Sequence, residues 1–136
     1  MPEQLEIIYR DAHYVAIDKP PGLLVHRSPL SGDRRFALQT LRDQLGRHVY
    51  PVHRLDRATS GILLFGLSAH AAGLLGRQFE AQQVQKTYLA VARGWVEPEG
   101  IIDHPLVDTE GRGIRQAART RYRRLATIEL PFATDR

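Results

Sequence analysis

A short run from His53 to Gly61, with the sequence HRLDRATSG, places one carboxylate among cations and small polar residues. Asp56 lies in the middle of the run, between Arg54 and Arg57. Positive neighbours favour the ionised form of a carboxylate. An ionised carboxylate can act as a nucleophile or as a base. These residue types therefore predict nucleophilic or acid–base chemistry at Asp56.

The same run also has a purely structural interpretation. Thr59, Ser60 and Gly61 are typical of tight turns held by side-chain-to-backbone hydrogen bonds, and exposed Arg–Asp pairs are worth only about 0–1 kcal/mol. A third interpretation is a hydrolase with a His53–Asp56 acid–base pair, but no serine elbow or second carboxylate is placed to assist it. From the residue chemistry alone, the capped turn and the catalytic loop both remain open.

Hydrophobic patterning predicts the elements that must position this run. Two helices are expected, one over 36–45 closed by Gly46 and one over 69–83 with Ser68 as its N-cap. An extended segment is expected over 49–53, where Pro51 favours an edge or a strand end. Short strands are expected over 5–9, 14–18, 23–25, 62–67, 86–92, 101–103 and 119–125. This order predicts an α+β fold, with a mixed, mostly antiparallel sheet and flanking helices.

Composition narrows the class of protein. The 136 residues suffice for one modest domain, and the absence of cysteine excludes disulfides, Cys-ligated zinc and thiol nucleophiles. The start of the chain lacks the pattern of a signal peptide, and no apolar run approaches the roughly 20 residues of a membrane span. These features favour a cytoplasmic protein with no membrane partner.

The basic residues point toward nucleic acid without proving it. The net charge is +4, and 17 of the 19 basic residues are arginines. Arginine grips phosphate with a planar fork and stacks on bases, so an RNA partner is one interpretation. The other interpretation is the codon bias of a GC-rich genome. The arginines that could contact phosphates are Arg27, Arg34, Arg35, Arg42 and Arg47.

Three blocks of sequence are similar to those of one known family. The run His53–Gly61 resembles the H-R-L-D-x-x-T-S-G signature of the RluA family of RNA pseudouridine synthases. Residues 15–26 resemble the family's opening strand and K-P-x-G loop, and residues 85–90 its K-x-Y-x-A strand. Details at 25–28, 41–44 and 93–95 are most similar to the branch of the family that modifies tRNA.

The resemblance implies roles for individual residues. Asp56 would be the catalytic aspartate, and Tyr88 would stack on the target uracil and take part in proton removal from C5. Arg54 would fill the space left by the target nucleotide. Lys19 and the loop behind it would be structural or backbone-contacting, and not catalytic. Without the resemblance, Tyr88 on its apolar segment would be read as a core residue. Substrate-binding residues are predicted to be Arg54, His53, Arg57 and Lys86.

The implied reaction is an isomerisation of uridine in structured RNA, with tRNA as the expected substrate. Uracil leaves C1′ of its ribose, turns and rejoins through C5, so no cofactor and no metal are required. Asp56 could attack C1′ or remove the 2′ proton, and the sequence does not choose between the two. The nucleotide must be flipped out of its stack to reach the carboxylate. The protein is expected to act as a monomer.

The chain also departs from the family. A T-G-R-x-H-Q-L-R motif, whose basic residue pairs with the catalytic aspartate in the family, has no match in these residues. Residues 1–136 are therefore expected to be the N-terminal part of a pseudouridine synthase catalytic domain, truncated at the C-terminal end and without a separate S4 domain. This polypeptide alone is expected to show little or no activity. The alternative to an enzyme is an inactive RNA-binding fragment of one.

Overall fold

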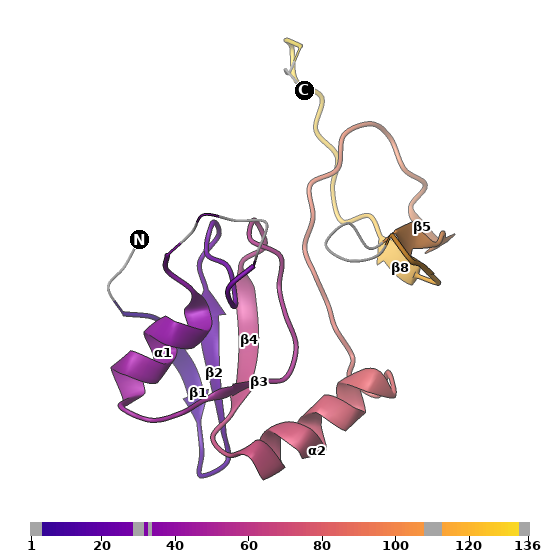
Figure 1. Ribbon diagram of the computed structural model, residues 1–136. Helices are drawn as coiled ribbons and strands as arrows, with labels where there is room; N and C mark the ends of the chain where they lie inside the picture. Colours follow the sequence, from indigo (N-terminus) through magenta and orange to yellow (C-terminus); the bar gives the residue numbers. More distant parts are fainter. Residues whose placement is uncertain (1–3, 29–31, 33, 108–112, 134–136) are drawn as a thin grey trace. The chain divides into compact units, whose positions relative to one another are not determined.

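The computed structural model describes residues 4–28, 32, 34–107 and 113–133, and the chain forms two compact units (Figure 1). The first unit covers Met1–Thr87 and the second covers Tyr88–Arg136. The HRLDRATSG run lies wholly within the first unit.

The first unit is built on an antiparallel sheet of four strands in the order β1-β2-β4-β3. The bounds of these strands are β1 (Glu6–Arg10), β2 (Tyr14–Lys19), β3 (Tyr50–Pro51) and β4 (Gly61–Gly66). β3 is an edge strand, as Pro51 predicted, because proline cannot donate to a second neighbour. The run that carries Asp56 connects this short edge strand to the buried strand β4.

One face of the sheet carries the core. Strand alternation places Val15 and Ile17 of β2 opposite Phe65 and Leu63 of β4, and all four are fully buried. Helix α1 (Ala37–Leu45) covers this face and adds Leu41 to the cluster (Figure 1). The same alternation directs the side chain of the next β2 residue on this face, Lys19, inward.

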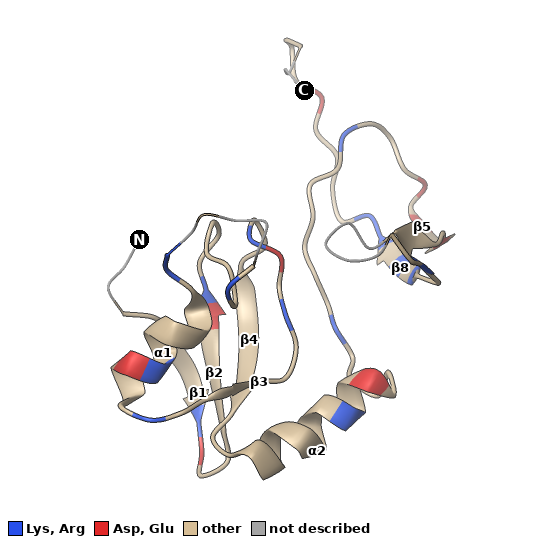
Figure 2. Ribbon diagram, viewed as in Figure 1, with Lys and Arg blue, Asp and Glu red and all other residues tan. Residues whose placement is uncertain are grey.

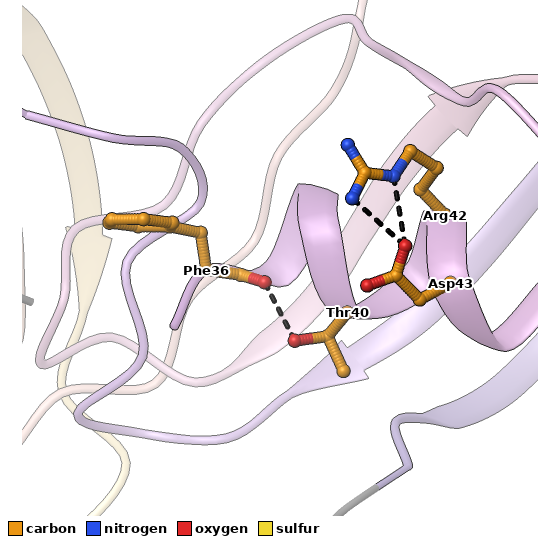
Figure 3. A network of polar contacts seen from close by, with 4 residues as sticks. All are labelled: Phe36, Thr40, Arg42 and Asp43. Atoms are coloured by element: carbon orange, nitrogen blue, oxygen red, sulfur yellow. Dashed lines mark hydrogen bonds and ion pairs between the residues drawn. The ribbon is translucent and has the colours of Figure 1, made fainter. Parts of the chain in front are cut away.

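Local hydrogen bonds define both ends of α1. The hydroxyl of Thr40 donates to the carbonyl oxygen of Phe36 at 2.8 Å, while Gly46 ends the helix in the left-handed conformation at φ 63°. Arg42 and Asp43 form an exposed ion pair at 2.9 Å on the helix surface (Figure 3). The predicted helix over 36–45 and its closing glycine are confirmed.

Helix α2 (Ala69–Glu80) follows β4 and packs against it. Ser68 caps the helix, as predicted, and its Oγ accepts a hydrogen bond from the amide of Ala71 at 3.1 Å. The helix approaches the strand closely at Gly66, where an added Cβ would lie 2.7 Å from the Cβ of Ala72. The phenol of Tyr14 donates to the carbonyl oxygen of Ala71 at 3.0 Å, which joins β2 to the same helix.

The second unit consists of paired strands with few buried side chains. Antiparallel pairs form between β5 (Glu99–Asp103) and β8 (Arg119–Arg123), and between β6 (Leu106–Val107) and β7 (Arg115–Gln116). The described helices and mostly antiparallel strands of the chain confirm the predicted α+β class.

Two predicted strands are absent. Residues 86–92 form no strand, and Leu89 and Val91 are exposed, because no strand in the described part of the chain pairs with this segment. Residues 23–25 form only a single bridge, between Leu24 and Phe36. α2 ends at Glu80, earlier than predicted, and Gln82 takes a positive φ of 56° just beyond it. None of the described helices has the length and apolar character required to cross a membrane.

Candidate active-site loop

The loop that carries Asp56 is anchored by the residue before it. Leu55 is buried and belongs to the core cluster of the first unit. The side chain of Asp56 is 82% exposed. The sequence Leu-Asp therefore places one side chain in the core and the next in solvent, which holds the backbone of the loop while leaving the carboxylate accessible.

A turn shapes the loop beyond Asp56. The amide of Thr59 donates to the carbonyl oxygen of Asp56 at 3.0 Å, and Gly61 begins β4 with a φ of 122°. Residues with a Cβ rarely adopt this φ, so a glycine at this position allows the chain to enter β4. The predicted turn is present, and the contact between Thr59 and Asp56 joins two backbone groups rather than a side chain and the backbone.

The charges around Asp56 come from two places. The Nη2 of Arg54 lies 3.6 Å from Oδ1 of Asp56, and the side chain of Arg54 is 49% exposed. Figure 2 shows basic segments on both sides of an acidic one in the loop between β3 and β4. Ion pairs of this length and exposure contribute little to stability. The pair therefore places a positive charge beside the carboxylate without fixing its position.

Lys19 supplies the second cation, from the end of β2. Its side chain is fully buried, and its Nζ donates to three carbonyl oxygens: that of Leu23 at 2.7 Å, that of Pro20 at 3.0 Å and that of Arg57 at 3.1 Å. Burial lowers the pKa of Lys19, and the negative charge of Asp56 acts in the opposite direction. Three acceptors match the three protons of an ammonium, which explains how a buried lysine is tolerated.

The K-P-P-G segment and the Asp56 loop are joined through one carbonyl group. The oxygen of Arg57 accepts from the Lys19 ammonium and also from the amide of Gly22, at 2.7 Å. Gly22 takes a φ of 88°, which favours glycine at that position. The predicted structural, backbone-contacting role of Lys19 is confirmed, and one of its contacts is with the residue directly after Asp56.

His53 lies at the start of the loop and is partly buried. Its Nε2 accepts a hydrogen bond from the amide of Leu64 in β4 at 3.0 Å, and its ring stacks on Phe79 of α2 with centroids 4.5 Å apart. Burial lowers the pKa of His53, and the positive charge of Lys86 lowers it further. No local pattern in the sequence indicated that Phe79 would contact His53.

The remaining predicted site residues are placed as follows. Arg57 has an exposed side chain, and Lys86 is exposed at the end of the first unit. Tyr88 begins the second unit with an exposed ring. Their roles toward a substrate stay predictions, as do those of Asp56, Arg54 and His53. Among the described residues, no three His, Asp or Glu side chains gather in a way that could hold a metal ion.

Taken together, the first unit presents one accessible carboxylate on a loop held at both ends. His53 and Leu55 hold the loop before Asp56, and the carbonyl of Arg57 holds it after. A carboxylate positioned by packed elements, with a cation beside it, is suited to act as a nucleophile or a base on a substrate that approaches from solvent.

Comparisons with known proteins identify relatives along almost the whole chain. A family model for RNA pseudouridylate synthase matches residues 13–132. The tRNA pseudouridine synthase C of Pasteurella multocida is 49% identical over 142 residues, which cover 97% of this chain and 58% of the relative. The protein of the same name from Vibrio parahaemolyticus is 44% identical and covers 99% of this chain and 59% of the relative.

Solved structures agree with the fold. The structure of human RNA Pseudouridylate Synthase Domain Containing 1 is 28% identical, has a TM-score of 0.68 and covers 88% of this chain and 51% of that one. Human RNA Pseudouridylate Synthase Domain Containing 4 has a TM-score of 0.63 at 21% identity, a likeness in fold. The chain thus spans somewhat more than half the length of the two bacterial relatives compared.

Proposed function

This chain belongs to the RNA pseudouridylate synthase family, and from this premise we propose that the complete protein converts a uridine of tRNA to pseudouridine with Asp56 as the catalytic carboxylate. The family match confirms the resemblance carried by the HRLDRATSG run. One observation supports the role of Asp56 above the others: the backbone on both sides of it is held, by the core at Leu55 and by Lys19 at Arg57.

The reaction requires one bond to break and one to form. The bond between N1 of uracil and C1′ breaks, the base turns, and C5 bonds to C1′. C5 then loses its proton and N1 gains one, so the product has the composition of the substrate. Asp56 either attacks C1′ as N1 leaves or removes the 2′ proton of the ribose. Both routes require a carboxylate that is ionised and can reach the sugar.

The proposed substrate contacts suit a flipped nucleotide. The guanidinium of Arg54 lies 3.6 Å from Asp56 and is half-exposed, and it would fill the space that a flipped nucleotide leaves. Tyr88 would stack on the uracil at about 1–3 kcal/mol. Arg57, Lys86 and His53 complete the proposed substrate contacts.

The choice of tRNA is supported by the names of the relatives and by the arginine-rich composition. Relatives named tRNA pseudouridine synthase C are 44–49% identical to this chain in Vibrio parahaemolyticus and Pasteurella multocida. Arginine contacts with phosphate would make affinity fall with rising salt. The cytoplasm as location and the monomeric state belong to the same proposal, as does the assignment of 1–136 to the N-terminal part of the catalytic domain.

A second candidate applies to residues 1–136 by themselves, namely RNA binding without turnover. It is favoured by the exposure of Asp56, because the proposed chemistry takes place in a site closed to bulk water. It is favoured also by the length of the relatives, of which this chain spans 58–59%.

The test measures pseudouridine in an unmodified tRNA transcript by mass spectrometry, after incubation with the complete gene product or with residues 1–136. We expect turnover by the complete product, and RNA binding with little or no turnover by residues 1–136. Absence of turnover by the complete product would overturn the proposed activity. Turnover by residues 1–136 would overturn the second candidate.

Asp43 provides a matched control for Asp56. Both are exposed aspartates of the first unit that lie beside an arginine. In the complete product, Asp56→Asn should abolish turnover with RNA affinity nearly unchanged, while Asp43→Asn should leave both unchanged. Retained turnover in Asp56→Asn would exclude the nucleophile and base roles alike.

A further inference from the structure

The edge of β4 loses its backbone partner near the candidate loop. β3 pairs with Gly66 and Phe65 of β4, through Tyr50 and Pro51. One residue farther back along β4, the amide of Leu64 donates instead to Nε2 of His53 at 3.0 Å. The imidazole therefore takes the place of a strand carbonyl where the short edge strand ends, and it satisfies a donor that would otherwise need water or a partner.

The same ring has a second contact, on its face. His53 and Phe79 are stacked, with centroids 4.5 Å apart and an interplanar angle of 9°. Phe79 belongs to α2, which packs on β4. One side chain thus joins the start of the Asp56 loop to a central strand and to a helix.

We infer that His53, in its neutral form, is a positioning residue for Asp56. The chain runs from His53 through Arg54 and the buried Leu55 to the carboxylate, so the hydrogen bond to Leu64 and the stack on Phe79 fix where this segment begins. This inference rests on the proposed function, and it deepens it by giving the first residue of the signature a role in holding the loop. Contact of His53 with substrate stays a separate prediction.

The hydrogen bond depends on the protonation state of the ring. Nε2 can accept only when it carries no proton, so the neutral ring must bear its proton on Nδ1. Protonation would replace the acceptor with a second donor facing the amide of Leu64. β4 has no titratable side chain, and α2 carries His70, Arg77 and Glu80. Lys86 acts on His53 and disfavours the charged ring, as burial does.

Two substitutions separate the hydrogen bond from the stack. His53→Phe keeps a ring on Phe79 but removes the acceptor, and His53→Gln keeps an oxygen within reach of the Leu64 amide but removes the ring. In the complete protein, His53→Phe should lower kcat at least about tenfold. His53→Gln should recover most of the kcat that His53→Phe loses. The exposed His48, changed to Phe and to Gln, provides the matched controls.

A readout that does not depend on activity is hydrogen exchange at the Leu64 amide, measured by NMR and corrected for the intrinsic rate. The amide should be protected in the unaltered protein and in His53→Gln, and should exchange faster in His53→Phe. In the unaltered protein, protection and kcat should both decline as His53 becomes protonated at acidic pH. In His53→Gln this acidic decline should be absent.

The outcomes distinguish this inference from the proposed function. If the complete protein makes no pseudouridine, the proposed function fails, and exchange at Leu64 still decides whether His53 holds β4. If turnover is present and His53→Phe matches the unaltered protein in kcat or in protection of Leu64, the inference is wrong. If His53→Phe does not fold, His53→Gln decides, because an unchanged acidic decline in that variant would contradict the inference.

Discussion

The ammonium of Lys19 lies 3.1 Å from the carbonyl oxygen of Arg57, the residue directly after Asp56. This contact links the end of β2 to the loop that carries the candidate catalytic group. The amide of Gly22 donates to the same oxygen, so the K-P-P-G segment and the HRLDRATSG run form one structural unit. Two blocks that stand far apart in the sequence are thus joined at one backbone oxygen.

Replacing Lys19 with methionine should destabilise the first unit. The carbonyl oxygens of Pro20 and Leu23 would lose the ammonium donor, and that of Arg57 would keep only the amide of Gly22. Each unsatisfied buried group costs about 1–3 kcal/mol. Because water would reach some of them, we expect the free energy of unfolding to fall by about 2–5 kcal/mol. Urea denaturation measures it. The exposed Lys86, changed to methionine, should shift stability by no more than about 0.5 kcal/mol. Equal stability of Lys19→Met and the unaltered chain would contradict a stabilising role of the Lys19 ammonium.

Arg54 should matter for turnover and hardly at all for folding. Its ion pair with Asp56 is long and exposed, so Arg54→Ala should change the free energy of unfolding by less than about 1 kcal/mol. In the complete protein, kcat should fall roughly tenfold while the Kd for tRNA changes much less. Steady-state kinetics and filter binding measure the two. A comparable loss in both would indicate a simple phosphate contact instead.

Gly66 should be the glycine of this region that tolerates alanine least. An added Cβ would lie 2.7 Å from both the Cβ and the amide nitrogen of Ala72, so α2 would have to move away from β4. We expect Gly66→Ala to cost about 1–3 kcal/mol. Gly76 lies in the same helix as Ala72 with open space where its Cβ would be, and Gly76→Ala should stabilise by about 0.5–1 kcal/mol. Thermal unfolding of the two variants should shift in opposite directions, and a shared direction would contradict this packing.

Stability should decline on the acidic side of the ordinary histidine range because of His53. Its pKa in the folded chain is lowered from the usual 6.5, so the unfolded chain binds a proton more readily. The stabilisation is present above pH 6.5 and is lost as pH falls from there through the lowered folded pKa. Chemical denaturation at several pH values measures the slope. His53→Gln should flatten this part of the profile, and an unchanged slope would assign the acidic loss to other groups.

Local patterns sufficed for much of the fold and for the candidate residue. Strand alternation and helical spacing predicted β1, β2, β4, α1 and α2, together with the Ser68 cap and the Gly46 end. They failed for residues 86–92, whose apolar character is typical of a strand. A strand also needs a neighbouring strand to pair with its backbone groups, and the sequence of the segment does not show whether such a neighbour is available.

The sequence by itself determined which carboxylate to consider, because the HRLDRATSG run singles out Asp56 and belongs to a recognisable family. Only the tertiary structure decided what holds that carboxylate in place. The carbonyl of Arg57 meets Lys19 from 38 positions away, and the amide of Leu64 meets the ring of His53 across the edge of β4. Such contacts depend on how the sheet brings distant backbone groups together. Local sequence patterns do not predict that geometry.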